Sequence, residues 1–155
     1  MFSMNRVITL LLLIGITISA SFFGCKRSVT SNNTYSMKAK IGSTDVYTAP
    51  NCLAVINASS MVIEGLAGSA PFPSYPYIEL VIPNWYGSQG PYPVDSLLGH
   101  PHIRYYIDAD HTKISWYGSI IINSVSTEII TGTFTCTTQD TTLISEGAFT
   151  AKVFK

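Results

Sequence analysis

Strict alternation of apolar and polar residues is the feature that most constrains this chain. From residue 130 to residue 137, threonine occupies every odd position, while Ile130, Phe134 and Cys136 occupy even positions. Successive side chains of a β-strand point to opposite faces, so one face of this segment is apolar and the other carries hydroxyl groups. Similar alternation, or a short apolar run, recurs between turn residues in the segments 36–41, 46–48, 52–56, 61–66, 78–82, 103–107, 114–122 and 149–153.

This pattern predicts an all-β domain. Short strands separated by Gly, Pro, Asn and Asp are typical of an antiparallel β-sandwich or flattened barrel, here of about 8–9 short strands. We expect a single such domain over residues 37–155 and no helix of ordinary length within it. In the segment 114–122 we expect one face to hold Ile114, Trp116, Ile120 and Ile122.

The N-terminal segment predicts export. Arg6 precedes an uncharged run from Val7 to Phe23, which is the layout of a secretory signal peptide. The run ends in Gly24 and Cys25 and resembles the bacterial lipobox, in which a small residue precedes a cysteine that receives fatty acyl chains such as palmitate. Phe22 departs from that pattern, because an aliphatic residue is usual there. We expect residues 1–24 to be a lipoprotein signal peptide and Cys25 to be the lipidated N-terminus of the mature protein.

Two alternatives stay open at this end of the chain. Cleavage after Ala20 would leave Cys25 as a free thiol of a soluble protein, and an uncleaved apolar run would form an anchor helix. With lipid on Cys25, two or three acyl chains anchor the protein stably. Residues 25–36 are then the lipidated cysteine and a flexible polar tether. Because no acidic run follows Cys25, we expect the periplasmic face of the outer membrane and leave surface exposure open.

Charge sets aside one class of partner. The chain has 9 Lys+Arg and 9 Asp+Glu residues, without a local cluster of basic residues. Nucleic-acid binding requires a basic surface that attracts phosphate groups, so we expect no nucleic-acid partner. The expected partners are the membrane, through the N-terminal lipid, and an envelope protein or glycan.

Four short motifs resemble a known group of proteins. Residues 90–94 (GPYPV), Tyr105-Tyr106, residues 130–134 (ITGTF) and residues 144–149 (ISEGAF) follow one another in this order. The succession resembles an uncharacterised family of Bacteroidota lipoproteins, which end in a GTF strand and a GxF strand. In both strands the glycine precedes a core phenylalanine by two residues. The resemblance covers residues 37–155 and implies a β-sandwich domain of unknown function, and it transfers no functional residue.

Cys52 and Cys136 both fall on the apolar face of an expected strand. In an oxidising compartment two such thiols can form a disulfide, which stabilises a fold by roughly 4–5 kcal/mol in the chain-entropy model. The alternative is two separate buried thiols that pack as small apolar groups. Nothing in the sequence marks either cysteine as a catalytic thiol with a partner histidine.

The three histidines are close in sequence. His100, His102 and His111 accompany Asp108 and Asp110, and these residue types ligate zinc, but their spacing matches no established motif. His102 and Asp108 fit the solvent face of one strand, and residues 108–111 fit a turn. We therefore expect a polar strand edge and turn, with no metal and no cofactor.

Residues 71–93 contain six of the eight prolines and six aromatic residues of the domain. Aromatic rings on a loop stiffened by proline can form a platform that stacks on a sugar ring or an apolar partner. The alternative is that these rings cap the core and keep their polar tips in water. The candidate ligand-binding residues are Tyr75, Tyr77, Trp85, Tyr86 and Tyr92.

The sequence carries no catalytic signature beside these features. It has no nucleophile elbow, phosphate-binding glycine loop or metalloprotease helix, and its four glutamates are scattered. We therefore nominate no catalytic residue and expect a non-enzymatic binding or interaction module with an unknown ligand. The alternatives are an envelope hydrolase acting on glycan or peptide, which would use a pair of carboxylates, and a purely structural envelope protein.

Overall fold

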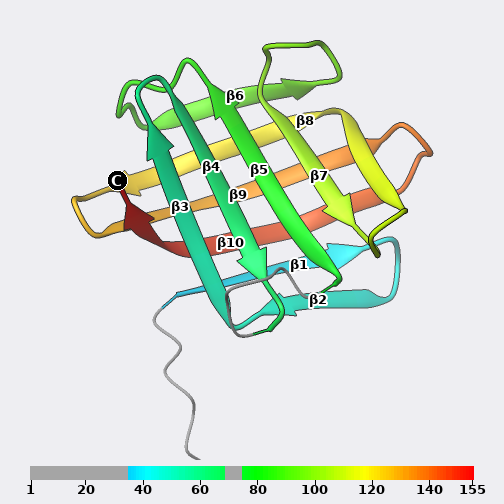
Figure 1. Cartoon of the computed structure of the whole chain (residues 1–155). Coiled ribbons are helices and arrows are strands. Elements are labelled where there is room, and N and C mark those ends of the chain that lie inside the picture. Colours follow the sequence, from blue (N-terminus) through cyan, green and yellow to red (C-terminus); the bar gives the residue numbers. More distant parts are fainter. Residues whose placement is uncertain (1–34, 69–74) are drawn as a thin grey trace, which may run out of the picture. The chain divides into compact units, whose positions relative to one another are not determined.

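The computed structural model describes residues 35–68 and 75–155. The all-β prediction is confirmed for this part of the chain, which contains ten strands and no helix (Figure 1). Among the described residues, no helix has the length and apolar character needed to cross a membrane. The predicted signal peptide, Cys25 and the tether up to residue 34 lie outside the described residues. The strands are β1 (Ser36–Ile41), β2 (Asp45–Ala49), β3 (Asn51–Asn57), β4 (Ser60–Leu66), β5 (Tyr77–Pro83), β6 (Gly90–Asp95), β7 (His102–Tyr106), β8 (Thr112–Val125), β9 (Ile129–Thr138) and β10 (Leu143–Phe154).

Seven of these strands close into a barrel. The hydrogen-bonded order is β10, β3, β4, β5, β7, β8, β9 and back to β10. All of the pairs are antiparallel except β10 and β3, which run parallel over three residues, from Lys152 opposite Leu53 to Phe154 opposite Val55. β1 and β2 extend the sheet from β10, and β6 extends it from β8. The barrel therefore carries three additional strands outside its closed ring.

The two longest strands, β8 and β10, each pair with two different strands in succession along one of their edges. The first residues of β8 pair with β7, whereas residues 117–122 pair with β6. Residues 144–150 of β10 pair with β1, whereas residues 152–154 pair with β3. In Figure 1, β3, β4, β5 and β7 form a layer that crosses over the layer of β8, β9 and β10. The barrel is thus flattened into two layers that are joined where β8 and β10 change partner.

The core fills the space between these layers. The alternation in β9 is confirmed, because Ile130, Phe134 and Cys136 are buried. Burying one large apolar side chain stabilises a fold by about 1.5–3 kcal/mol relative to leaving it exposed. The largest fully buried apolar side chains are Met37, Met61, Ile63, Ile78, Leu80, Ile82, Ile103, Ile120, Ile122, Ile130 and Ile144.

The two glycine–phenylalanine motifs pack against each other. Gly132 on β9 is the direct partner of Phe149 on β10, and Gly147 on β10 is the direct partner of Phe134 on β9. A Cβ on Gly132 would lie 2.5 Å from the Phe149 ring, and a Cβ on Gly147 would lie 2.7 Å from the Phe134 ring. Each ring therefore covers the glycine of the opposite strand, a packing that only a residue without a side chain permits. This contact explains why each glycine precedes its phenylalanine by two residues.

The expectation that one face of β8 holds Ile114, Trp116, Ile120 and Ile122 is wrong. Ile120 and Ile122 are buried, but Ile114 is 39% exposed and Trp116 is 55% exposed. The register between β8 and β9 shifts around Trp116, and a β-bulge of this kind inverts the alternation on one side of it. Ser115 is the buried residue instead, and its hydroxyl accepts a backbone N–H of β7 at 3.0 Å.

β6 is the strand that the alternation does not predict, because Pro91 and Pro93 give its sequence the composition of a loop. The backbone N–H of Asp95 points away from β8, since it donates to the carbonyl oxygen of Pro101 at 3.2 Å. Backbone N–H groups two residues apart along a strand point the same way, so positions 91 and 93 are oriented like Asp95. Proline has no N–H group, and the missing N–H groups of Pro91 and Pro93 therefore belong to the outer edge of β6. Prolines at this edge hinder the addition of another strand.

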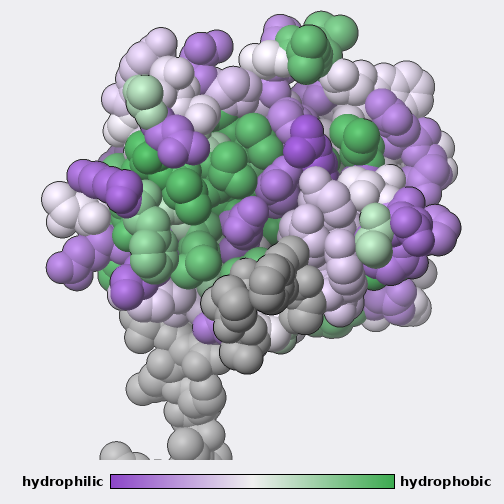
Figure 2. Space-filling model, in the orientation of Figure 1, coloured by the Kyte–Doolittle hydropathy of each residue, from purple (hydrophilic) through white to green (hydrophobic). Residues whose placement is uncertain are grey.

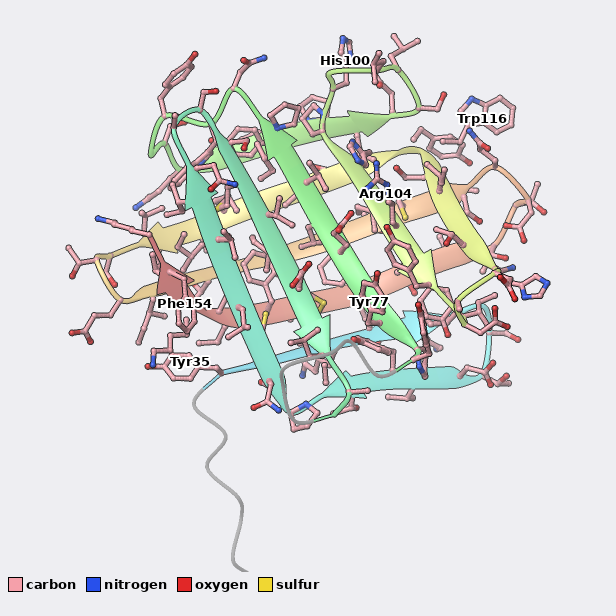
Figure 3. The ribbon with its side chains drawn as sticks, viewed as in Figure 1. Tyr35, Tyr77, His100, Arg104, Trp116 and Phe154 are labelled. Atoms are coloured by element: carbon pink, nitrogen blue, oxygen red, sulfur yellow. The ribbon has the colours of Figure 1, made fainter. Side chains whose placement is uncertain are left out.

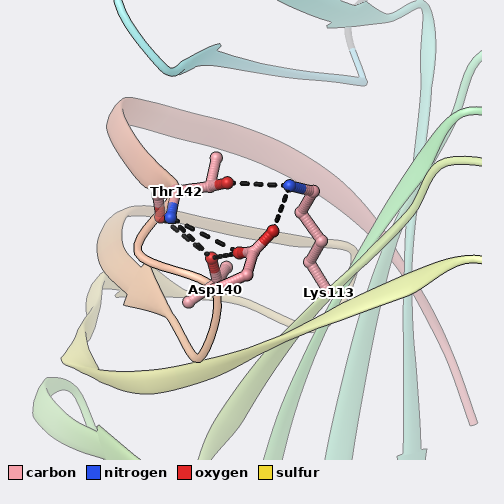
Figure 4. Close-up of polar contacts among 4 residues, drawn as sticks. Lys113, Asp140 and Thr142 are labelled. Carbon is pink, nitrogen blue, oxygen red and sulfur yellow. Dashed lines mark hydrogen bonds and ion pairs between the residues drawn. The ribbon is translucent and has the colours of Figure 1, made fainter.

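A polar network ties the turn between β9 and β10 to β8 (Figure 4). The Lys113 ammonium group donates to the Asp140 carboxylate and, at 2.8 Å, to the Thr142 hydroxyl. The Thr138 hydroxyl donates to the same carboxylate. These hydrogen bonds, the one from Lys113 first, hold the pKa of Asp140 well below its usual range. The network is therefore intact at neutral pH and is lost only as the pH falls through that lowered pKa.

We expect Gly132→Ala to lower the free energy of unfolding by about 1–3 kcal/mol, because overpacking forces the Phe149 ring and the backbone of β8 to move. Urea denaturation followed by tryptophan fluorescence measures the change. Thr133→Ala is the matched control, because Thr133 is the next residue of β9 and is exposed. We expect the control to change stability by less than about 0.5 kcal/mol. A Gly132→Ala protein as stable as the wild type would contradict the packing role of this glycine.

Candidate functional site

The outer face of β3, β4, β5 and the end of β10 carries an apolar row that is exposed at one end and half-buried at the other. Phe154, Val55, Val62 and Val81 follow one another across the strands, because each is the direct partner of the next. Val55 is 36% exposed and Phe154 is 45% exposed. Figure 2 shows the apolar side chains gathered over these strands, with hydrophilic side chains beside them. A contiguous exposed apolar surface is typical of an interaction site.

A charged row runs beside the apolar row. Glu64 on β4 is the direct partner of Glu79 on β5, and Glu79 is the direct partner of Arg104 on β7. The Arg104 Nη1 atom lies 2.9 Å from the Glu79 Oε1 atom. The strand register therefore places two carboxylates and one guanidinium group next to one another beside the apolar row.

Glu64 is the unbalanced charge of this row. Among the described residues its carboxylate forms no ion pair. The Glu79 carboxylate, in contrast, is paired with the Arg104 guanidinium group. Burial raises the pKa of Glu64, and the Glu79 carboxylate raises it further. Like charges directly opposite one another destabilise a sheet. Perturbed carboxylates of this kind are concentrated at binding and catalytic sites.

Three tyrosine rings continue the face on the other side of the charged row. The Tyr77 and Tyr106 rings are stacked, with centroids 4.2 Å apart and an interplanar angle of 10°. The Tyr75 ring is tilted against Tyr77, with centroids 5.5 Å apart. Burial, and then the neighbouring Tyr106, raise the pKa of Tyr77, so its hydroxyl stays protonated at neutral pH. Figure 3 shows that Tyr77 and Arg104 belong to the same layer.

A small pocket of about 140 Å³ opens beside Arg104. His102, Arg104 and Ile114 line it from the strands, and residues 96–99 line it from the loop between β6 and β7. The His102 Nδ1 atom lies 2.9 Å from the carbonyl oxygen of His100. Because a carbonyl oxygen only accepts, Nδ1 carries the proton of this hydrogen bond. The His102 Nε2 atom is shielded from solvent and has no hydrogen-bond partner.

We define the Arg104 face as Glu64, Tyr77, Glu79, Arg104 and Tyr106. The face offers aromatic and apolar surface for contact, a guanidinium group that donates hydrogen bonds, and carboxylates that accept them. Small-molecule and protein partners are both recognised by this combination of an apolar surface with a few fixed polar groups. The Arg104 face is therefore the candidate functional site.

The structure separates the five candidate ligand-binding residues. Tyr75 and Tyr77 lie together, but Trp85 and Tyr92 belong to a second cluster beyond the far end of β5, which begins at Tyr77. Trp85 is only 5% exposed and its indole N–H donates to the carbonyl oxygen of Ser88 at 3.1 Å. The Tyr92 hydroxyl donates to the same carbonyl oxygen at 2.8 Å. Trp85 and Tyr92 therefore close one end of the core, and no single platform spans residues 75–92. Tyr86, between them in sequence, is 78% exposed.

Sequence reasoning does not single out Arg104, Tyr106 or the pairing of Glu64 with Glu79. These residues become neighbours because β5 pairs with β7 and not with β6, the next strand along the chain. The outward position of Glu79 and of Arg104 could be derived from the alternation. Their mutual contact could not, because it depends on the strand order.

The histidines are divided among separate partners. The His100 Nδ1 atom lies 2.7 Å from an Asp95 carboxylate oxygen, and the His111 Nδ1 atom lies 2.8 Å from an Asp108 carboxylate oxygen. Asp95 precedes β7, whereas Asp108 follows it. Within residues 35–68 and 75–155 no three metal-ligating side chains gather at one place.

Cys52 and Cys136 are free, buried thiols in the structure. Burial raises the pKa of Cys52, and it raises the pKa of Cys136 to about 12. The thiolate is the nucleophilic form of cysteine. Both thiols are therefore protonated and unreactive at neutral pH.

A larger hollow of about 370 Å³ lies on the outer face of β8, β9 and β10. Its lining combines the hydroxyl-bearing Ser119, Thr133 and Thr135 with apolar, small and charged residues: Ile121, Phe134, Gly147, Ala148, Lys38 and Glu146. Hydroxyl-bearing side chains are usual on the solvent face of a sheet. The hollow lacks the stacked rings and opposed carboxylates of the Arg104 face, so it is the weaker candidate.

Comparison of the chain with protein-family models, with curated proteins and with solved structures returned no match. The resemblance to Bacteroidota lipoproteins therefore stays a prediction.

We expect Glu64→Gln to raise the free energy of unfolding at pH 7 by about 0.2–1 kcal/mol, because it removes a like charge opposite Glu79. The folded state raises the pKa of Glu64, so protonation relieves the same repulsion as the pH falls. The advantage of the glutamine variant should therefore vanish near the ordinary glutamate pKa of about 4.3. Thermal melts between pH 7 and pH 4 measure it.

Glu128→Gln is the control for this experiment, because Glu128 is an exposed glutamate outside the Arg104 face. We expect this variant to show no comparable gain at pH 7. A constant difference between Glu64→Gln and the wild type over the whole pH range would show that repulsion at Glu64 is not its cause.

Proposed function

We propose that this protein is a lipid-anchored cell-envelope lipoprotein whose β-domain is a non-enzymatic binding module, with the Arg104 face as its binding site. The claim that the Arg104 face is the binding site rests on one observation. Glu64, Glu79 and Arg104 form a row between an apolar and an aromatic surface. A sheet face that only meets water gains nothing from opposed carboxylates or from outward-facing valines. A partner that covers the face would bury Val62 and Val81 beside it and neutralise Glu64.

The first half of the proposal rests on the sequence. The signal-peptide layout and the Gly24-Cys25 junction agree with each other, and the resemblance to Bacteroidota lipoproteins is consistent with both. A lipidated Cys25 holds the domain at the outer membrane, on its periplasmic face, with the cell surface as the alternative. Residues 26–36 would connect the lipid to the domain.

The chemistry of the Arg104 face limits the ligand. Arginine beside stacked tyrosines suits a partner that presents hydrogen-bond acceptors next to an apolar or ring-shaped group. Glu64 suits a donor or a positive charge. An envelope protein or a glycan meets these requirements, and a nucleic acid does not, since its phosphates would meet the two carboxylates.

A second candidate function is hydrolysis of an envelope glycan or peptide. The specific observation in its favour is the pair Glu64 and Glu79, of which Glu64 has a raised pKa, as a general acid requires. Against it, Glu79 is held by Arg104, and the described pockets do not include either carboxylate. A purely structural role is the third possibility, and it predicts no ligand at this face.

The binding site is tested by photo-crosslinking in the native host. A benzoylphenylalanine in place of Tyr106 should yield a defined adduct, because it sits on the Arg104 face. The same group in place of Thr133, on the exposed face of β9 in the other layer, is the matched control and should yield none. Adding Arg104→Met should weaken the adduct by about tenfold or more, as expected for loss of an interfacial arginine. Equal adducts from both positions would contradict the proposal.

The hydrolase alternative is tested on the same protein. Purified cell-wall sacculi and envelope peptides are incubated with the wild type and with Glu64→Gln and Glu79→Gln. Release of soluble fragments that either variant abolishes would replace the binding module by an enzyme. Sedimentation with sacculi without fragment release would support a glycan-binding module.

We expect Cys25→Ala to move the protein from the membrane fraction to the soluble fraction, because the variant cannot be acylated and keeps no acyl chain. Fractionation of cells carrying a C-terminal tag measures this. Protease treatment of intact cells then reports which side of the outer membrane the wild type occupies. Membrane association of Cys25→Ala equal to that of the wild type would overturn the lipoprotein proposal.

A further inference from the structure

The C-terminal end of β10 forms an exposed corner that is both apolar and basic. Phe154 and Val55 are exposed direct partners. Lys152 is the partner of the next outward residue of β3, Leu53. The Lys152 Nζ atom lies 5.3 Å from the centroid of the Phe154 ring, and the exposed Lys155 follows. We call these five residues the β10 corner.

The chain joins the domain beside this corner. Ser36, the first residue of β1, pairs with Thr150 of β10, and β10 continues from there to Phe154. In Figure 3, Tyr35 and Phe154 lie at one side of the domain, and His100 and Trp116 lie at the other. The β10 corner is therefore the part of the apolar row that is next to the N-terminal connection.

Tyr35 is the tenth residue after Cys25. A fully extended chain spans at most about 3.3–3.6 Å per residue, so this connection reaches roughly 35 Å. A lipid on Cys25 would keep Tyr35 within that distance of the bilayer, and with it the neighbouring β10 corner close to the membrane. Such confinement raises the effective concentration of the corner at the membrane surface, and so a weak contact becomes populated.

We infer that the β10 corner docks on the bilayer that holds the Cys25 lipid, with Phe154 in the interface and Lys152 and Lys155 on anionic lipid headgroups. This inference rests on the proposed lipid anchor. An aromatic ring flanked by lysines is the combination that binds membrane interfaces, because the ring leaves water while the ammonium groups stay at headgroup level. Juxtamembrane lysines are attracted by the negative surface potential of such membranes.

Two glutamates lie near the corner. The backbone of Glu128 contacts Val153 through its carbonyl oxygen at 2.9 Å, and Glu64 is the direct partner of Leu53. Neither would favour contact with anionic headgroups, so the docked area ends at the edge of the face. The charged row begins beside Leu53 and so borders the docked area, whereas Trp116 lies at the far side of the domain.

The test uses the mature lipoprotein reconstituted in vesicles of phosphatidylethanolamine and phosphatidylglycerol that carry an acceptor dye on the lipid headgroup. A donor dye is attached either at Thr127→Cys, an exposed position in the turn just before Glu128, or at Leu98→Cys, an exposed position at the far side. The native Cys52 and Cys136 are buried and do not compete for the dye. We expect strong energy transfer from position 127 and weak transfer from position 98.

Two sets of variants identify the contacts. Phe154→Ser should reduce the docked fraction relative to the undocked one by roughly tenfold, the ratio expected for one buried aromatic side chain. Lys152→Gln combined with Lys155→Gln should weaken docking on these vesicles and leave the weaker docking on pure phosphatidylcholine vesicles unchanged. Leu97→Ser is the control and should change nothing. Equal transfer from positions 127 and 98, or transfer from position 127 that is unaffected by Phe154→Ser, would overturn the inference.

Failure of the anchor gives a different result from failure of docking. If Cys25 carries no lipid, the protein does not stay with the vesicles after flotation and neither dye transfers energy. If the anchor is present but the corner does not dock, the protein floats with the vesicles and the two positions transfer equally. A fold damaged by Phe154→Ser is recognised by a lowered melting temperature, and Phe154→Leu, which keeps apolar bulk, should then retain most of the docking.

Discussion

Closure of the barrel through three parallel residue pairs is the constraint on which the rest of this structure depends. β10 reaches β3 only at Lys152, Val153 and Phe154, and β8 reaches β7 only through its first residues. Without these two junctions the layers would be separate sheets with four additional open edges. The junctions exist because β8 and β10 are long enough to leave one partner and continue beside another. The crossing of the two layers, the buried core and the register of the outer face all follow from this arrangement.

That register turns an ordinary pattern into a specific surface. Each strand alone shows only alternation, in which some of the outward-facing positions hold a valine and others a glutamate. Once β3, β4, β5 and β7 are aligned, the outward residues form continuous rows: one apolar, one charged and one of tyrosines. Hydrogen bonding of the backbone, which is indifferent to side-chain identity, has thereby placed Glu64 opposite Glu79. Folding alone gains nothing from that contact, because like charges directly opposite one another destabilise a sheet.

The sequence predicts most of the strands because the signal it carries is local. Alternation at 36–41, 78–82 and 130–137 is sufficient to place β1, β5 and β9, since one side of each strand meets the core. The alternation does not predict β6, because the edge prolines give this strand the composition of a loop. It also misplaces residues of β8, because a bulge at Trp116 changes which of them face inward. Stacking of Tyr77 on Tyr106 needs β5 and β7 to be neighbours, a fact of strand order that no window of sequence contains. For the same reason the alternation could not say whether Cys52 and Cys136 approach each other.

The two ends of the described sheet are β2 and β6, and they differ in a way that bears on self-association. A fibril built by strand pairing needs two free sheet edges on every molecule. One edge pairs with the molecule before it and the other edge pairs with the molecule after it. Pro91 and Pro93 close one of these edges, while β2 keeps its backbone groups. Two molecules could therefore pair through their β2 edges. A third molecule could add only at a β6 edge, which Pro91 and Pro93 block. This asymmetry limits strand pairing to two molecules and so opposes the growth of a filament.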